Sequence, residues 1–153
     1  MKKYRVSKVE IPSHNKKRKE ELVAQGRSHG IIVYSNNKPV GWCQYGPREE
    51  APAIDRGRFY RKLDLKNDGR LWRISCFFVD KDFRKRGVAA VALRAAIDSI
   101  GRKGGGTVEA YPRTSKHGGS VSLWFGTADM FQREGFKPVA PLGGSVLMRK
   151  AIS

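Results

Sequence analysis

The chain lacks any run of about 20 apolar residues, so no segment is expected to span a membrane. Cysteine is scarce: Cys43 and Cys76 lie in apolar segments, which favours buried thiols in a reducing compartment over a disulfide framework. These two cysteines and three scattered histidines offer no metal-ligand spacing, so no metal is expected. The basic N-terminal segment is not followed by an apolar run, unlike a secretory signal, and we expect a cytoplasmic protein.

Acidic residues are also scarce: the chain has 14 Asp and Glu but 31 Lys and Arg, which gives a net charge of +17. Such a charge attracts RNA, DNA and anionic cofactors without selecting among them. A basic surface without a macromolecular partner explains it equally well, and no known nucleic-acid-binding motif is present, so an RNA partner is conceivable but not favoured. The 153 residues predict one domain over 1–153, with residues 1–28 as a basic, atypical N-terminal part.

Apolar periodicity and turn residues predict a mixed sheet with helices, an α+β fold. The central strand–helix–strand unit requires a parallel pair, whereas the two hairpins are antiparallel. Between the first hairpin and this unit, residues 46–70 form a long loop with a short helix near 56–62. The other expected elements are a helix over 13–25, a hairpin over 30–45, a strand over 71–79, a helix over 87–103, a strand over 107–111, a helix over 127–134 and a hairpin over 136–150.

A basic loop connects the strongest predicted strand to the most apolar predicted helix. The first N–H groups of a helix have no internal partner and carry partial positive charge, so they bind phosphate well. Gly87 would let a phosphate approach the backbone, Ala89 leaves room, and Arg84-Lys85-Arg86 attract the anion. The loop therefore predicts a diphosphate site; the alternative is an ordinary capped helix with exposed basic residues.

This loop, Arg84-Lys85-Arg86-Gly87-Val88-Ala89, resembles the Gln/Arg-x-x-Gly-x-Gly/Ala coenzyme A motif of the GNAT superfamily, the acetyl-CoA-dependent N-acetyltransferases. Gly135-Phe136 after a helix is similar to a second mark of that family, and Val40-Gly41-Trp42 resembles its second hairpin strand. The resemblance covers about residues 30–152.

The resemblance implies a mostly antiparallel sheet splayed between the strand ending at Val79 and the strand 107–111. It further implies acetyl-CoA as co-substrate, a pantetheine arm pairing with that open strand, and direct acetyl transfer to a primary amine in a ternary complex. The expected coenzyme contacts are Phe78, Val79, Arg84, Lys85, Arg86, Gly87, Val88, Ala89 and Phe131.

The general acid is not where the family pattern puts it. Many members carry a Tyr four residues before the glycine of Gly-Phe, but Phe131 stands here and cannot donate a proton. Glu109 and Tyr111 share one face of their strand, so we expect Glu109 to receive a proton through water and Tyr111 to donate one if this face meets the splay. The alternative is that Tyr111 packs and Glu109 pairs with a nearby Lys or Arg.

The acceptor is expected to be a small-molecule or peptide amine. Trp42 and Tyr45 of the hairpin, the loop 46–70 and the segment 113–121 are the expected contacts. A polyamine-like or antibiotic-like amine, a protein terminus and an aminoacyl-tRNA stay open, as do a monomer and a homodimer. Two other functions remain open: a non-catalytic acyl-CoA sensor, and a basic nucleic-acid-binding module.

Overall fold

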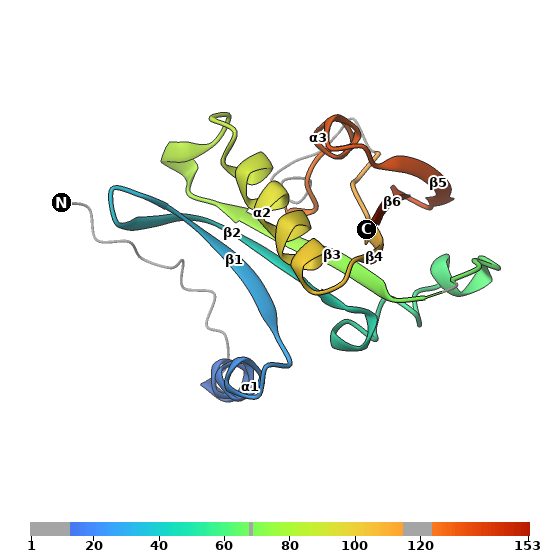
Figure 1. Ribbon diagram of the computed structural model, residues 1–153, viewed down its shortest axis with the longest axis horizontal. Coiled ribbons are helices and arrows are strands. Elements are labelled where there is room, and N and C mark those ends of the chain that lie inside the picture. Colours follow the sequence, from blue (N-terminus) through green and yellow to red (C-terminus); the bar gives the residue numbers. More distant parts are fainter. Residues whose placement is uncertain (1–12, 68, 115–123) are drawn as a thin grey trace.

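A computed structural model describes residues 13–67, 69–114 and 124–153 of the chain (Figure 1). Residues 1–12 of the N-terminal part and residues 115–121 of the segment 113–121 lie outside the described residues. Six strands form one sheet in the order β1-β2-β3-β4-β6-β5. The strands are β1 (His29–Ser35), β2 (Lys38–Pro47), β3 (Leu71–Val79), β4 (Gly106–Ala110), β5 (Lys137–Leu142) and β6 (Ser145–Ile152).

Within the described ranges, three α-helices accompany the sheet: α1 (Ser13–Ala24), α2 (Val88–Arg102) and α3 (Ala128–Arg133). Figure 1 shows α2 lying along the middle of the sheet, with α1 apart from it near the start of β1. The predicted strands and helices are confirmed to within a few residues. The short helix expected near 56–62 is reduced to a 3₁₀ turn at Tyr60–Lys62, and a 3₁₀ turn at Lys81–Phe83 was not anticipated.

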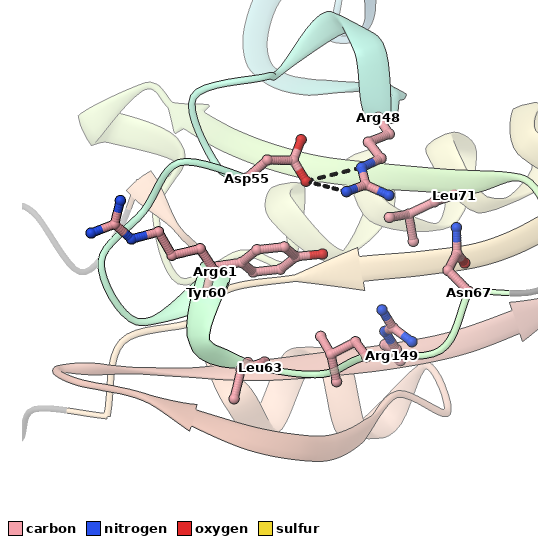
Figure 2. Close-up of a pocket in the computed structure, with 9 residues that line it drawn as sticks. Arg48, Asp55, Tyr60, Arg61, Leu63, Asn67, Leu71 and Arg149 are labelled. Carbon is pink, nitrogen blue, oxygen red and sulfur yellow. Dashed lines mark hydrogen bonds and ion pairs between the residues drawn. The ribbon is translucent and has the colours of Figure 1, made fainter.

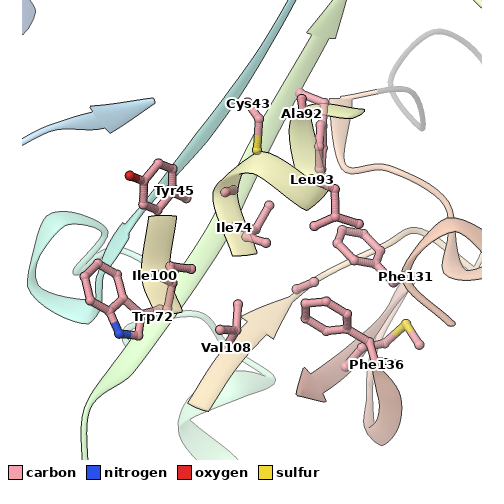
Figure 3. Packing of buried hydrophobic residues seen from close by; sticks show 14 residues of the cluster. Cys43, Tyr45, Trp72, Ile74, Ala92, Leu93, Ile100, Val108, Phe131 and Phe136 are labelled. Atoms are coloured by element: carbon pink, nitrogen blue, oxygen red, sulfur yellow. The ribbon is translucent and has the colours of Figure 1, made fainter. Parts of the chain in front are cut away.

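The core lies between α2 and one face of the sheet (Figure 3). Leu93 and Ile100 of α2 are fully buried, and so are Cys43 of β2 and Phe77 of β3 to within 1%. Small residues such as Ala92 and Ala96 let the helix approach the strands closely. Both cysteines are free thiols; Cys43 is buried as predicted whereas Cys76 is only half-buried, and burial raises the pKa of each.

The sheet opens along one seam. Strands β3 and β4 are parallel and pair only at Leu71↔Thr107, Trp72↔Val108 and Arg73↔Glu109. The other four strand pairs are antiparallel. From Ile74 to Val79, the edge of β3 that faces β4 pairs with no strand among the described residues. The predicted mostly antiparallel, splayed sheet is therefore confirmed.

A β-bulge in β3 decides which side chains face which side of the sheet. Gln44 pairs with Cys76 whereas Tyr45 pairs with Ile74, so Ser75 is an extra residue. Ile74 and Phe77 both belong to the core beside α2. Arg73 before the bulge and Phe78 after it consequently lie on the opposite face, which we call the outer face.

Candidate active site

A cavity of about 580 Å³ lies at the open end of the seam, between β3, the start of α2 and the segment that leads into α3. Its walls combine backbone donors, basic side chains and apolar groups. The lining residues are Phe77, Phe78 and Val79 of β3; Phe83, Arg84, Lys85, Gly87, Val88, Ala89 and Ala90 of the loop and helix; and Trp124, Gly126, Thr127, Met130 and Arg133.

The N-terminus of α2 opens into this cavity. Gly87 takes the N-cap position with φ of 78° and has no side chain to bond the first-turn N–H groups. A Cβ built on Gly87 would meet no atom within 4 Å, so the approach to these donors is open. Lys85, at φ 60°, also takes the left-handed conformation that non-glycine residues seldom adopt.

The basic side chains of the loop are arranged unequally. Arg84 and Lys85 line the cavity, and Arg84 Nε donates to the Val79 carbonyl oxygen at 3.3 Å, where β3 ends. Arg86 does not line it, and its guanidinium lies 5.6 Å from the centre of the Phe83 ring. Two of the three predicted basic residues therefore face the cavity directly.

Aromatic residues form the opposite wall. The rings of Phe78 and Trp124 meet edge-on with centroids 6.0 Å apart. Phe131, expected as a coenzyme contact, does not line the cavity: it is fully buried and packs edge-on against Phe77 and Phe136. That expectation is corrected, because α3 turns this residue into the core. Trp124 and Met130 were missed because no periodicity in the sequence places them opposite β3.

The two residues expected to contact the acceptor lie on opposite faces of β2. Tyr45 is 4% exposed, and its hydroxyl lies 2.6 Å from Ser99 Oγ of α2. It is a core residue, so its expected contact with the acceptor is corrected. Trp42 is half-buried on the outer face, where a Cβ added to Gly30 would lie 2.9 Å from its indole Nε1.

Glu109 and Tyr111 share a face of the sheet as predicted, at the vertex where the seam opens. Tyr111 donates a hydrogen bond of 2.7 Å to Oε2 of Glu109, which is fully buried. Arg149 of β6 and Tyr60 of the long loop donate to Oε1 at 2.6 and 2.9 Å. Burial, and secondarily Glu109, raise the pKa of Tyr111, so its hydroxyl stays protonated at neutral pH. Neither residue lines the large cavity.

A network of charges surrounds this vertex and holds the long loop on the outer face. Arg73, 1% exposed, makes two hydrogen bonds of 2.9 Å to Asp55, while its Nε lies 3.6 Å from Glu109. Hydrogen bonds from Arg73 lower the pKa of Asp55 to about 2, and Arg48 contributes to the same effect. A cavity of about 180 Å³ beneath the loop is lined by Arg48, Asp55, Tyr60, Arg61, Leu63, Leu65, Asn67, Leu71 and Arg149 (Figure 2).

Two negative observations concern the described residues alone. Over residues 13–67, 69–114 and 124–153, no three His, Cys, Asp or Glu side chains come together as metal ligands would. Within the same ranges, no helix has the length and apolar character needed to cross a membrane.

Comparisons with known proteins now identify the family. Residues 3–124 match the model of the Acetyltransferase (GNAT) family, and no curated protein matches the chain. A GNAT-family acetyltransferase from Streptococcus pneumoniae superposes with a TM-score of 0.59 at 13% identity, over 95% of this chain and 79% of that one. The ribosomal-protein-S18-alanine N-acetyltransferase from Escherichia coli gives a TM-score of 0.53 at 16% identity, over 88% and 77%.

A third structure contains the coenzyme. It is the PaiA N-acetyltransferase from Thermoplasma acidophilum in complex with coenzyme A, with a TM-score of 0.52 at 10% identity, over 94% of this chain and 80% of that one. At these identities the neighbours establish the fold, while the family match covers most of the chain. The chain belongs to the GNAT family of acetyltransferases, enzymes that transfer an acetyl group from acetyl-CoA to an amine.

Proposed function

We propose that the cavity at the N-terminus of α2 is the acetyl-CoA site of this enzyme. The observation that carries the proposal is the uncapped first turn of α2, with Gly87 as N-cap, opening into a cavity beside the unpaired edge of β3. The N–H groups of Val88, Ala89 and Ala90 would donate charge-assisted hydrogen bonds to the oxygens of the diphosphate. Arg84 and Lys85 add positive charge at the same mouth.

The residues of the cavity fit the rest of the coenzyme. The edge of β3 at Phe78 and Val79 offers backbone groups that an extended pantetheine arm pairs with as an added strand would. Phe78, Trp124 and Met130 give that arm an apolar wall. In this arrangement the thioester lies along β3, toward the vertex of the seam.

Transfer then depends mainly on positioning. The amine nitrogen forms a bond to the thioester carbonyl carbon, the C–S bond breaks, and the amine loses a proton while the thiolate gains one. An alkyl amine of ordinary pKa requires about 4–5 kcal/mol to be neutral at pH 7. Holding amine and thioester together is worth effective molarities of about 10⁵–10⁸ M, which exceeds the 10²–10⁴ typical of acid–base assistance.

Tyr111 is the proposed hydrogen-bond donor to the leaving thiolate; its single O–H, which bonds Glu109 before the reaction, turns to the sulfur as the C–S bond breaks, and the thiolate takes its proton from water. It follows the last residue of β4, past the final β3–β4 pair, and its hydroxyl remains protonated at neutral pH. The Glu109 carboxylate holds this hydroxyl, but both of its oxygens already accept hydrogen bonds. Positioning Tyr111 therefore suits Glu109 better than taking the proton of the amine, which we assign to water.

Two glycines provide a matched test of the coenzyme site. Gly87 and Gly26 both have left-handed φ values, 78° and 66°, and a Cβ on either would meet nothing within 4 Å. Gly87→Glu places a carboxylate where the diphosphate would bind, so we expect acetyl-CoA affinity to fall by at least about a hundredfold in calorimetry. Gly26→Glu adds the same charge and strain beyond the end of α1 and should leave affinity unchanged. Equal affinities for the two variants would refute the site.

A further inference from the structure

The outer face carries a row of apolar side chains that crosses three strands. Ile32 of β1 pairs with Trp42 of β2, and Trp42 pairs with Phe78 of β3. All three point away from α2, because Gly41 faces Val88 of that helix and Ile31 packs on the core. We call Ile32, Trp42 and Phe78 the acceptor row.

The acceptor row joins the outer edge of the sheet to the proposed thioester site. At its inner end Phe78 lines the large cavity and contacts Trp124, which is 44% exposed. At its outer end Ile32 is 53% exposed, and nearby Tyr34 is 61% exposed. Trp42 and Phe78 between these ends are half-buried, and adjacent apolar groups that solvent still reaches commonly mark a binding surface. Continuity with the cavity makes the acceptor of the reaction its natural occupant.

One positive charge stands over the middle of the row. Lys19 Nζ of α1 lies 6.0 Å from the centre of the Trp42 ring and donates to Ser28 Oγ. Among the described residues, no ion pair joins Lys19 to a carboxylate; Glu50, whose charge acts on Lys19 from a distance, has Oε1 2.7 Å from His29 Nδ1. Desolvation lowers the pKa of Lys19, as expected for a cation that lacks a bound anion.

The side chains of the row disfavour polycationic acceptors. A polyamine or aminoglycoside needs carboxylates along its path, but the acceptor row contains none, and Lys19 would repel a second positive charge. An apolar ring, by contrast, can stack on Trp42 and Phe78, and a carboxylate can pair with Lys19.

We propose that the acceptor is a small primary amine bearing an apolar ring and a carboxylate, with its ring on the acceptor row and its carboxylate at Lys19. This rests on the proposed function, since it places the amine beside Phe78, where the thioester would lie. The row and Lys19 thus select the substrate, while the cavity at α2 holds the donor.

Three probe amines separate the features of such an acceptor. Phenylalanine has the ring and the carboxylate, 2-phenylethylamine has the ring alone, and spermidine has neither. Binding is measured by calorimetry to the protein alone and to the protein saturated with coenzyme A, so turnover is not required. We expect phenylalanine to bind at least about tenfold more tightly than 2-phenylethylamine, and spermidine most weakly.

Substitutions in the row and on α1 assign these effects to residues. Trp42→Ala should raise the Kd of both ring-bearing amines by roughly tenfold and leave the affinity for acetyl-CoA unchanged. Lys19→Met should raise the Kd of phenylalanine by a similar factor but not that of 2-phenylethylamine. Lys17→Met is the control, because Lys17 is an exposed lysine of the same helix.

Three outcomes would overturn this proposal while leaving the coenzyme site intact. These are preferential binding of spermidine, a Lys19→Met variant that treats the three amines as wild type does, and absence of phenylalanine binding to a protein that does bind acetyl-CoA. Loss of acetyl-CoA binding by the wild-type protein would instead contradict the proposed function. Lys19 is partly exposed, so its substitution tests the idea even if Trp42→Ala does not fold.

Discussion

The two ends of β3 differ in how the edge that faces β4 is used: one end is paired with β4, and the other is unpaired. From Leu71 to Arg73 the edge is closed by β4 and covered on the outer face by ion pairs. From Ile74 to Val79 it is open and borders the large cavity. At the closed end the charged groups pair with one another, although Arg73 Nε, 3.6 Å from Glu109, makes no hydrogen bond. At the open end the backbone and the first turn of α2 keep donors and acceptors available.

The largest expected loss of stability comes from removing Glu109, the central carboxylate of the closed end. Glu109→Ala would leave Arg73 buried without its neighbour and Arg149 without its partner, which should lower the free energy of unfolding by about 3–5 kcal/mol. Glu134→Ala, which removes a pair with the half-exposed Arg94, should cost less than about 1 kcal/mol. Urea titration measures both, and similar losses would show that burial does not set the cost.

Two tyrosines donate hydrogen bonds to the Glu109 carboxylate, and we expect their substitution to change kcat by different amounts. Tyr111→Phe removes the proposed hydrogen-bond donor beside the seam, so kcat should fall by about 10² or more while the KM for acetyl-CoA changes little. Tyr60→Phe deletes an equivalent hydrogen bond to Glu109 from the loop side and should change kcat only a few-fold. Steady-state thiol release measures this, and equal kcat values in the two variants would remove Tyr111 from the chemistry.

The smallest expected effect is on the free energy of unfolding at low pH. Arg73 lowers the folded-state pKa of Asp55 from 3.8 to about 2, so the ionised carboxylate stabilises the fold above the unfolded-state pKa. That contribution is lost as pH falls from about 4 through about 2. Asp55→Asn should therefore be less stable than wild type at pH 7, and the difference should shrink between pH 4 and pH 2. A constant difference in urea midpoints over that range would contradict the assignment.

The sequence predicted those parts of the fold that depend on local patterns. Strand β3 was predicted with its observed bounds, and Gly87 was placed at the start of α2, because apolar runs and a glycine after a basic turn are local signals. Expecting both Trp42 and Tyr45 at the acceptor conflicted with strand alternation, which places residues an odd number apart on opposite faces. Phe131 is buried because α3 directs it toward Phe77 and Phe136.

Long-range pairing is the part that the sequence did not reveal. The partners of Glu109 include Tyr60 and Arg149, which are 49 and 40 positions away. The sequence allows Glu109 to pair with a basic residue, but no local signal identifies Arg149 as that residue. The loop 46–70 lacked periodicity because its order comes from ion pairs such as Arg48–Asp55 rather than from an apolar face. Alignment of Trp124 with Phe78 likewise exists only in three dimensions.

Ser75, the extra residue of the β-bulge, shifts the phase of β3 by one position. In a regular strand, an odd-numbered and an even-numbered residue such as Arg73 and Phe78 would point to opposite sides. Because of the extra residue, Arg73 of the polar vertex and Phe78 of the apolar row lie on the same face of β3, with Cys76 between them. A single unpaired residue thus sets side by side two surfaces of opposite chemical character, one that holds the enzyme together and one suited to recognising what it modifies.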